Sequence, residues 1–175
     1  MTCSDMKIFI QSLNAFEASR VLNDLLEADS GLVQKAYECA VKVAADVDPE
    51  SICDAVYTCL SMLHFDDLNG RAGTQGGYLS PYEAACELFE ETLTHFVGEI
   101  VINWERGLPA AAKACCIGIV KGLQMYDEDP DSEFGGWVED VTGEFINSVV
   151  KEWKNGNPSS DDIAEIMMIV GGDRS

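Results

Sequence analysis

Apolar side chains recur every three or four residues along nearly the whole chain, and this spacing constrains the fold more than any other feature. Residues spaced in this way lie on one face of a helix, whereas a half-buried strand needs strict alternation, which is nearly absent here. The spacing therefore predicts an all-α fold. We expect seven or eight helices in the 175 residues, a length at which a domain buries roughly 70% of the surface that its unfolded chain exposes.

Helix-capping residues divide the first part of this pattern into segments. Asn14 and Glu17 form a capping box that begins one helix, and Ser30 caps the next. Asp48 followed by Pro49 begins a third helix, because the missing N–H of proline costs nothing at the first helical position.

The second part of the chain is divided by prolines and a glycine. Pro81 begins a long helix that Gly107 ends, Pro109 begins the next helix, and Ser160 caps the last one.

The segment 110–125 is small and apolar on nearly every side, which predicts the central and most buried helix. Gly118 and Gly122 are spaced four residues apart within it. Their missing side chains permit the backbone of a neighbouring helix to approach closely.

Short links between the segments predict antiparallel helix pairs. Three pairs, 14–46, 49–105 and 109–153, precede a C-terminal helix over 160–170 in a single domain of residues 1–175. One arrangement is a short α-solenoid of the HEAT kind, in which each pair touches only its neighbours. A compact helical bundle is the competing architecture.

The chain is strongly acidic, since 31 Asp and Glu residues against 11 Lys and Arg give a net charge of −20 at pH 7. Such a surface repels phosphate backbones and anionic membranes and attracts basic partners. The basic footprint of a nucleic-acid-binding protein is missing, so we expect no nucleic-acid partner. An acidic inhibitor that mimics nucleic acid is an alternative interpretation of the same charge.

No apolar run reaches the roughly 20 residues of a membrane helix, and Lys113 and Lys121 interrupt the most apolar segment, 108–125. We therefore expect no membrane association. Seven cysteines without a secretory signal indicate reduced thiols and a cytoplasmic protein. Six of them lie in apolar helical segments, where cysteine packs as a small hydrophobe. These are Cys39, Cys53, Cys59, Cys86, Cys115 and Cys116.

Residues 70–91, GRAGTQGGYLSPYEAACELFEE, place four glycines before a helix and so resemble a phosphate-binding loop. A Walker-type loop requires Lys and then Ser or Thr after its last glycine, whereas Tyr78 follows Gly77 here. Ser80 and Glu83 instead form a capping box. The segment is predicted to be a turn that begins a helix.

Acidic residues alternate along the segment YDEDPDSE, at Asp127, Asp129, Asp131 and Glu133. The spacing resembles the start of an EF-hand loop, but that loop needs glycine at its sixth position and glutamate at its twelfth, and neither is present. The segment is interpreted either as a looser divalent-cation site or as a solvated acidic loop.

Glu91, His95 and Glu99 lie four residues apart and hence on one face of the helix that begins at Pro81. Metal ligands can be spaced in this way. The Glu-x-x-His pattern of di-iron bundles and the Cys-x-x-Cys pattern of zinc sites are both missing, and we predict no cofactor. Glu91, His95 and Glu99 remain candidate ligands of a metal site that also uses the acidic segment 127–133.

The apolar C-terminal segment IAEIMMIV is expected either to dock on the end of the helical array or to meet another subunit. In the second case the protein is a homodimer that associates through this helix. The residues predicted to form the contact are Ile163, Ile166, Met167 and Val170.

The runs GLVQKAYECAVKVAADVD, GGYLSPYEAACELFEETLTHFVGEI, ERGLPAAAKACCIGIVKGL and GGWVEDV resemble the helical-repeat region that accompanies SWIM-type zinc fingers in prokaryotic proteins. The resemblance covers residues 20–155 and implies HEAT-like or tetratricopeptide-like helix pairs that serve protein interaction. The zinc motif of that family, Cys-x-Cys with a later Cys-x-His, is missing, so no metal ligands carry over.

These observations predict a non-enzymatic helical-repeat module that binds another, basic protein through a groove or face edged by carboxylates. The alternative from a different class is a divalent-metal-dependent enzyme or metal-binding protein that uses residues 127–133 with Glu91, His95 or Glu99. An acidic inhibitor that mimics nucleic acid is the third hypothesis.

Overall fold

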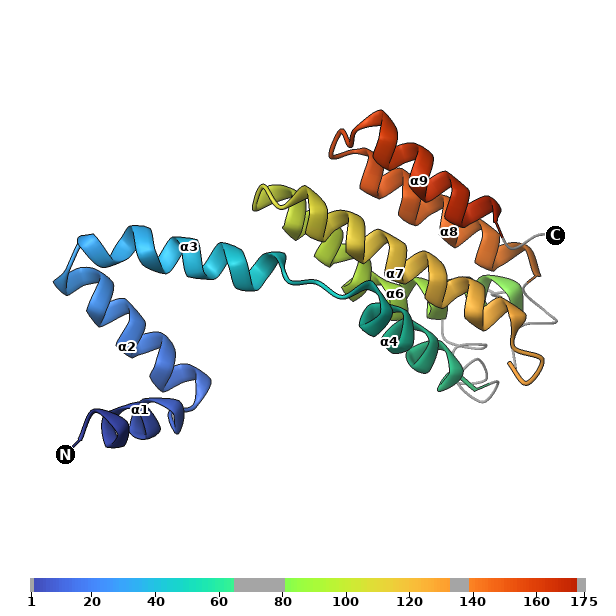
Figure 1. The fold of residues 1–175 in the computed structure, drawn as a ribbon. Helices are drawn as coiled ribbons and strands as arrows, with labels where there is room; N and C mark the ends of the chain where they lie inside the picture. Colours follow the sequence, from blue (N-terminus) through green and yellow to red (C-terminus); the bar gives the residue numbers. More distant parts are fainter. Residues whose placement is uncertain (1, 65–80, 133–138, 173–175) are drawn as a thin grey trace, which may run out of the picture. The chain divides into compact units, whose positions relative to one another are not determined.

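The computed structural model describes residues 2–64, 81–132 and 139–172, and the chain divides into two compact units, Met1–Val43 and Ala44–Ser175. Every regular element within the described residues is an α-helix, which confirms the predicted all-α fold (Figure 1). Each unit has its own pattern of packing.

The first unit consists of α1 (Cys3–Gln11), α2 (Ala15–Ala28) and α3 (Gly31–Ala45), of which the last extends two residues past the unit boundary. Within residues 2–45 these helices do not pack side by side, and none of their residues is buried. The antiparallel pair expected over 14–46 is therefore not formed by α2 and α3. This unit has helices but no core of its own.

Local hydrogen bonds explain where α2 and α3 begin. In the capping box expected at α2, the Glu17 N–H donates to Asn14 Oδ1 and the Asn14 N–H donates to Glu17 Oε2, both at 3.0 Å. At α3 we expected Ser30 to be the cap, but Asp29 Oδ1 accepts the Gly31 N–H at 2.8 Å. The carboxylate satisfies a backbone donor that has no partner inside the helix.

The second unit contains five described helices that pack around one of them. They are α4 (Pro49–Ser61), α6 (Pro81–Glu105), α7 (Pro109–Glu128), α8 (Glu139–Lys154) and α9 (Ser160–Gly171). Helix α7 contacts the other four, most extensively α4. Figure 1 shows α7 in gold, with α4 in teal on one side and α8 and α9 in orange and red on the other. This arrangement confirms the central helix expected over 110–125.

Two of three helix ends in this unit are formed by the residues expected from the sequence, and the third is formed by the neighbouring serine. Asp48 caps α4 as predicted, and Gly107 ends α6 with a φ of 70°, a left-handed conformation that favours glycine. Helix α9 is capped by Ser159, whose Oγ accepts the Asp162 N–H at 3.1 Å, and not by Ser160. Three residues after Ser159 lies Asp162, whereas three residues after Ser160 lies an isoleucine, so the spacing of a capping box selects Ser159.

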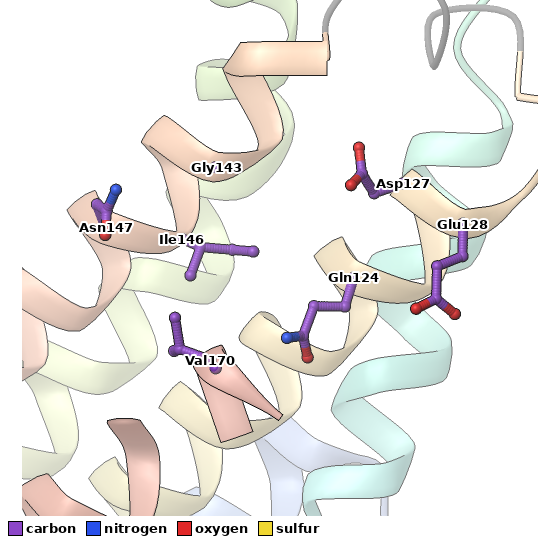
Figure 2. Close-up of a pocket in the computed structure, with 8 residues that line it drawn as sticks. Gln124, Asp127, Glu128, Gly143, Ile146, Asn147 and Val170 are labelled. Atoms are coloured by element: carbon purple, nitrogen blue, oxygen red, sulfur yellow. The ribbon is translucent and has the colours of Figure 1, made fainter. Parts of the chain in front are cut away.

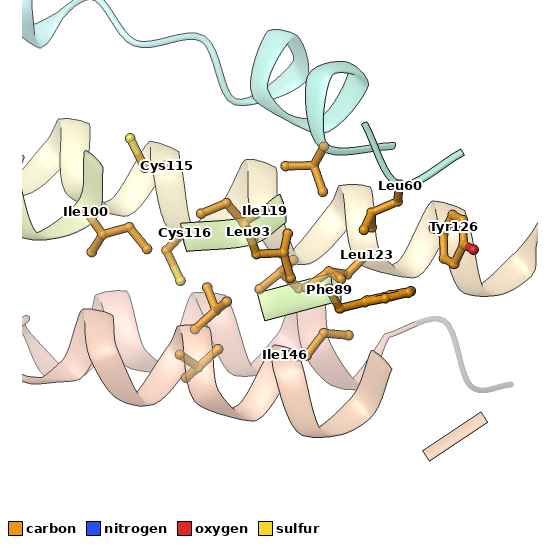
Figure 3. Packing of buried hydrophobic residues seen from close by; sticks show 14 of the residues in the cluster. Leu60, Phe89, Leu93, Ile100, Cys115, Cys116, Ile119, Leu123, Tyr126 and Ile146 are labelled. Atoms are coloured by element: carbon orange, nitrogen blue, oxygen red, sulfur yellow. The ribbon is translucent and has the colours of Figure 1, made fainter. Parts of the chain in front are cut away.

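The core of the second unit lies where α4, α6 and α8 meet α7. Figure 3 shows Phe89 and Leu93 of α6, Ile119 and Leu123 of α7, and Ile146 of α8 packed together, all of them buried. Small side chains on the remaining faces of α7 let other helices pack close to it. Although α7 is so extensively buried, no helix in the described ranges combines the length and apolar composition that crossing a bilayer requires.

Candidate functional site

The negative charge is concentrated in the second unit. Six of the 31 acidic and four of the 11 basic residues belong to Met1–Val43, which gives that unit a net charge of −2 and leaves −18 for residues 44–175. A surface of this charge concentrates basic partners around it. The second unit is therefore the part of the chain that attracts a basic partner most strongly.

Two lysines of α7 are already bound by carboxylates of neighbouring helices. Lys113 Nζ donates to Asp162 Oδ1 and to Glu165 Oε2 of α9, both at 2.6 Å, and Lys121 forms an ion pair with Glu50 of α4. These pairs link α4 and α9 to α7. They were not predicted from the sequence, because the partners lie far apart along the chain.

A groove of about 320 Å³ lies between α6 and α8. Its apolar lining residues are Leu93, Val97 and Val101 of α6 and Phe145 and Val149 of α8. Glu90 of α6 and Glu152 of α8 contribute one carboxylate from each helix. Gly98 also lines the groove, and a Cβ at this position would have no neighbouring atom within 4 Å, so the groove is open there.

The two carboxylates lie toward opposite ends of this groove. The rings of Phe89 and Phe145 are 5.9 Å apart between centroids, and Trp104 Nε1 donates to the Trp153 carbonyl at 3.1 Å. The early part of α6 therefore lies beside the early part of α8, and the late parts lie beside each other. Glu90 follows Phe89 directly, and Glu152 precedes Trp153. A groove with an apolar floor and a carboxylate toward each end can bind an amphipathic segment. The apolar face of that segment would pack on the floor, and basic residues next to this face would pair with the carboxylates.

A second cavity, of about 420 Å³, lies where α7, α8 and α9 meet (Figure 2). Its lining includes Asp127 and Glu128 of α7 and Asn147 of α8, over the apolar side chains of Ile146 and Val170. Carboxylate and amide oxygens accept hydrogen bonds from ammonium or guanidinium groups, so this cavity suits a basic side chain. The sequence had singled out Asp127 for a metal and Val170 for an interface, and the structure places both here.

The rest of the acidic segment has a structural role. Asp129 Oδ2 accepts the Tyr57 hydroxyl at 2.7 Å, and its Oδ1 accepts the Asp131 N–H at 2.9 Å. The Tyr57 hydroxyl, followed by the Asp131 N–H, holds the pKa of Asp129 below its usual range. Asp129 therefore ties the end of α7 to α4, while Asp127 and Asp131 are exposed. Glu133 lies outside the described residues.

The three candidates on α6 do not join the acidic segment. Glu91 and His95 are exposed and Glu99 is half-buried, and the His95 ring packs on Phe96 with centroids 5.8 Å apart. In the described part of the chain no three His, Cys, Asp or Glu side chains are grouped closely enough to hold a metal ion. The glycine-rich turn predicted over 70–80, with Ser80 as cap, lies outside the described residues.

The C-terminal helix docks within its own unit. Helix α9 packs against α7 and α8, Ile166 is buried there, and Ile163 and Val170 are half-buried against the core. Ile166 is therefore not on the surface that a second subunit reaches. Of the four residues predicted to form an interface, Met167 is the exposed one, at 47%.

The cysteines divide into buried, half-buried and exposed groups, and the half-buried ones are Cys59 and Cys86. Cys53, Cys115 and Cys116 are buried as predicted, and burial raises the pKa of the Cys116 thiol to about 12. Cys39 was expected in the core but is exposed, because α3 has no buried face. A thiol whose pKa is raised by burial is a packing group rather than a nucleophile.

Compared with known proteins, the chain matches no family model, no curated sequence and no solved structure. The resemblance to helical-repeat regions that accompany SWIM-type zinc fingers therefore stays a prediction from the sequence.

Proposed function

We propose that the second unit is a non-enzymatic protein-binding module that receives a basic amphipathic helix of another, cytoplasmic protein. The observation that supports this most directly is the α6–α8 groove, with its apolar floor and with Glu90 and Glu152 toward opposite ends. A partner helix with apolar residues every three or four positions would cover the floor. Lys or Arg residues beside that face would pair with the two glutamates.

The net charge of −18 in this part of the chain supports the same partner class. It accelerates the approach of a basic segment, an effect that weakens once salt shortens the Debye length to roughly 8 Å at 0.15 M. Exposed charge pairs contribute little binding energy each, so the apolar floor supplies most of the affinity.

The test is a fluorescence-anisotropy titration with a labelled synthetic amphipathic peptide of Leu and Lys. A peptide with Glu in place of Lys is the matched control. We expect the Lys peptide to bind, more weakly in high salt, and Glu90→Gln with Glu152→Gln to weaken binding several-fold. Glu105→Gln, which removes one carboxylate of α6 outside the groove, should leave it unchanged. Equal binding of both peptides, or equal effects of groove and control variants, would disprove the proposal.

A further inference from the structure

The first unit exposes an unusual amount of apolar side chain. Eleven large apolar residues of α1, α2 and α3 are between 39% and 76% exposed. These are Met6, Ile8, Phe9, Ile10, Phe16, Val21, Leu22, Leu25, Val33, Tyr37 and Val43. Summed over the three helices, these side chains expose on the order of 1,000 Å², the size class of one side of a standard interface.

The apolar faces of α1, α2 and α3 need a packing partner. The three helices have 9, 14 and 15 residues, and isolated helices of about 12–15 residues or fewer are marginal in water. In proteins, most helix stability comes from packing an apolar face, yet within residues 2–45 none of these faces is buried. The apolar faces of α1, α2 and α3 are therefore built to pack against something else.

The net charges of α2 and α3 indicate which element packs against their apolar faces. Helix α2 carries Glu17, Asp24 and Glu27 against Arg20, a net charge of −2. Helix α3 carries Lys35 and Lys42 against Glu38, a net charge of +1. The two helices thus have opposite net charges but do not pack on each other within the chain.

We infer that α1, α2 and α3 form a surface for self-association, in which α2 of one copy packs on α3 of a second copy. A two-fold axis makes this contact twice, because α3 of the first copy then packs on α2 of the second. Each partner in a standard interface buries about 800 Å², and the exposed apolar side chains supply on that order. Residues 44–175, with a net charge of −18, repel their counterpart, so the nearly neutral first unit is where two copies meet.

The experiment is light scattering of the full-length chain over a range of concentrations. We expect a mass of twice 19.1 kDa that falls to 19.1 kDa on dilution. Phe16→Ala together with Tyr37→Ala should raise the dissociation constant roughly tenfold or more, as expected for aromatic anchors of an interface. Alanine is the best helix former, so these changes do not break α2 or α3.

The matched control is Met168→Ala on α9, where an apolar side chain that is 73% exposed is removed from the second unit. It should leave the dimer intact. Higher salt should tighten the dimer by screening the two acidic units, which is the opposite of its effect on the basic peptide. If light scattering gives the monomer mass at every concentration, the apolar faces of α2 and α3 pack within their own chain. That result would overturn the inference. A dimer that tolerates Phe16→Ala and Tyr37→Ala but not Met168→Ala places the interface at α9 and also overturns it.

Discussion

A Cβ atom on Gly118 would lie 2.6 Å from the Cβ of Ile52 and 2.6 Å from the carbonyl oxygen of Pro49. At Gly122, one turn later, it would lie 2.7 Å from the Cβ of Val56. Real Cβ atoms do not approach other atoms this closely. The Gly-x-x-x-Gly pair in α7 therefore permits the close contact with α4, as the spacing of the two glycines predicted.

Gly118→Ala should destabilise the protein, although alanine usually stabilises a helix interior relative to glycine. The new methyl group would meet backbone of α4, which can move only by separating the two helices, and such overpacking costs about 1–3 kcal/mol. Gly98→Ala in α6 is the matched control, because a Cβ there meets nothing within 4 Å. It should raise the melting temperature slightly. Equal shifts of the two variants in a thermal melt would contradict this account.

The parts of the fold that could be predicted from the sequence are those decided within a few residues. The capping box of Asn14 and Glu17 and the start of α4 at Asp48 depend on side chains three residues away or less. The central position of α7 follows from its composition, since a helix that is apolar all round must be surrounded. The lack of a core around α2 and α3 could not be predicted from the sequence. An apolar stripe shows that a helix face packs against another element, but it does not show which element that is.

The candidate site shows the same limit. Helix α6 has apolar residues on more than one face, and Phe89 faces the core while Val97 and Val101 line the groove. Periodicity gives both faces the same hydrophobic signal. Which of them is covered depends on where α8 packs, and that is decided by contacts between residues far apart in the sequence. For the same reason the sequence identified Asp127 as a candidate site residue but did not identify Asn147, which lines the same cavity from α8.

Alkylation should separate the exposed from the buried thiols. Cys3 and Cys39 are exposed, whereas Cys115 and Cys116 are buried in the core. With a pKa of about 12 instead of 9.0, Cys116 has a roughly thousandfold smaller thiolate fraction at neutral pH. We expect iodoacetamide followed by peptide mass spectrometry to find Cys3 and Cys39 modified in the native protein. Cys115 and Cys116 should react only in denaturant, and their modification at the same rate as Cys39 would contradict the packing described.

Removal of residues 1–43 should leave the melting temperature of the remaining chain nearly unchanged. Every buried residue of the described chain lies between Cys53 and Ile166, so the deletion removes no core. We expect a shift smaller than about 2–4 °C, the change that 1 kcal/mol makes in a protein of this size. Circular dichroism during heating measures it. A shortened chain that melts without a cooperative transition would show that the first unit contributes to the core after all.

Because Lys113 contacts α9 through carboxylates, the free energy of unfolding should decrease both at high pH and at low pH. The hydrogen bonds that Lys113 donates to Asp162, and then to Glu165, raise the pKa of Lys113 above 10.5, and the same contact with Lys113 lowers the pKa of Asp162 below 3.8. The contribution of Lys113 is complete below 10.5 and is lost as pH rises through its raised pKa. That of Asp162 is complete above 3.8 and is lost as pH falls through its lowered pKa.

Lys113→Met removes the loss of stability at high pH and the part of the loss at low pH that depends on Lys113, while the hydrogen bonds between Ser159 and Asp162 remain. Methionine keeps an unbranched side chain at this position. The melting temperature of the variant should fall below that of the native protein by a few degrees at most, because Asp162 and Glu165 are 37% and 57% exposed and such pairs contribute little. The difference should be largest between pH 3.8 and 10.5 and should decrease gradually outside these limits, as pH falls through the lowered pKa of Asp162 or rises through the raised pKa of Lys113. Lys151→Met, on the exposed side of α8, makes the same change to the net charge and corrects for the general repulsion among carboxylates. If Lys113→Met and Lys151→Met change the melting temperature equally at every pH, the contribution belongs to the net charge and not to the contact between α7 and α9.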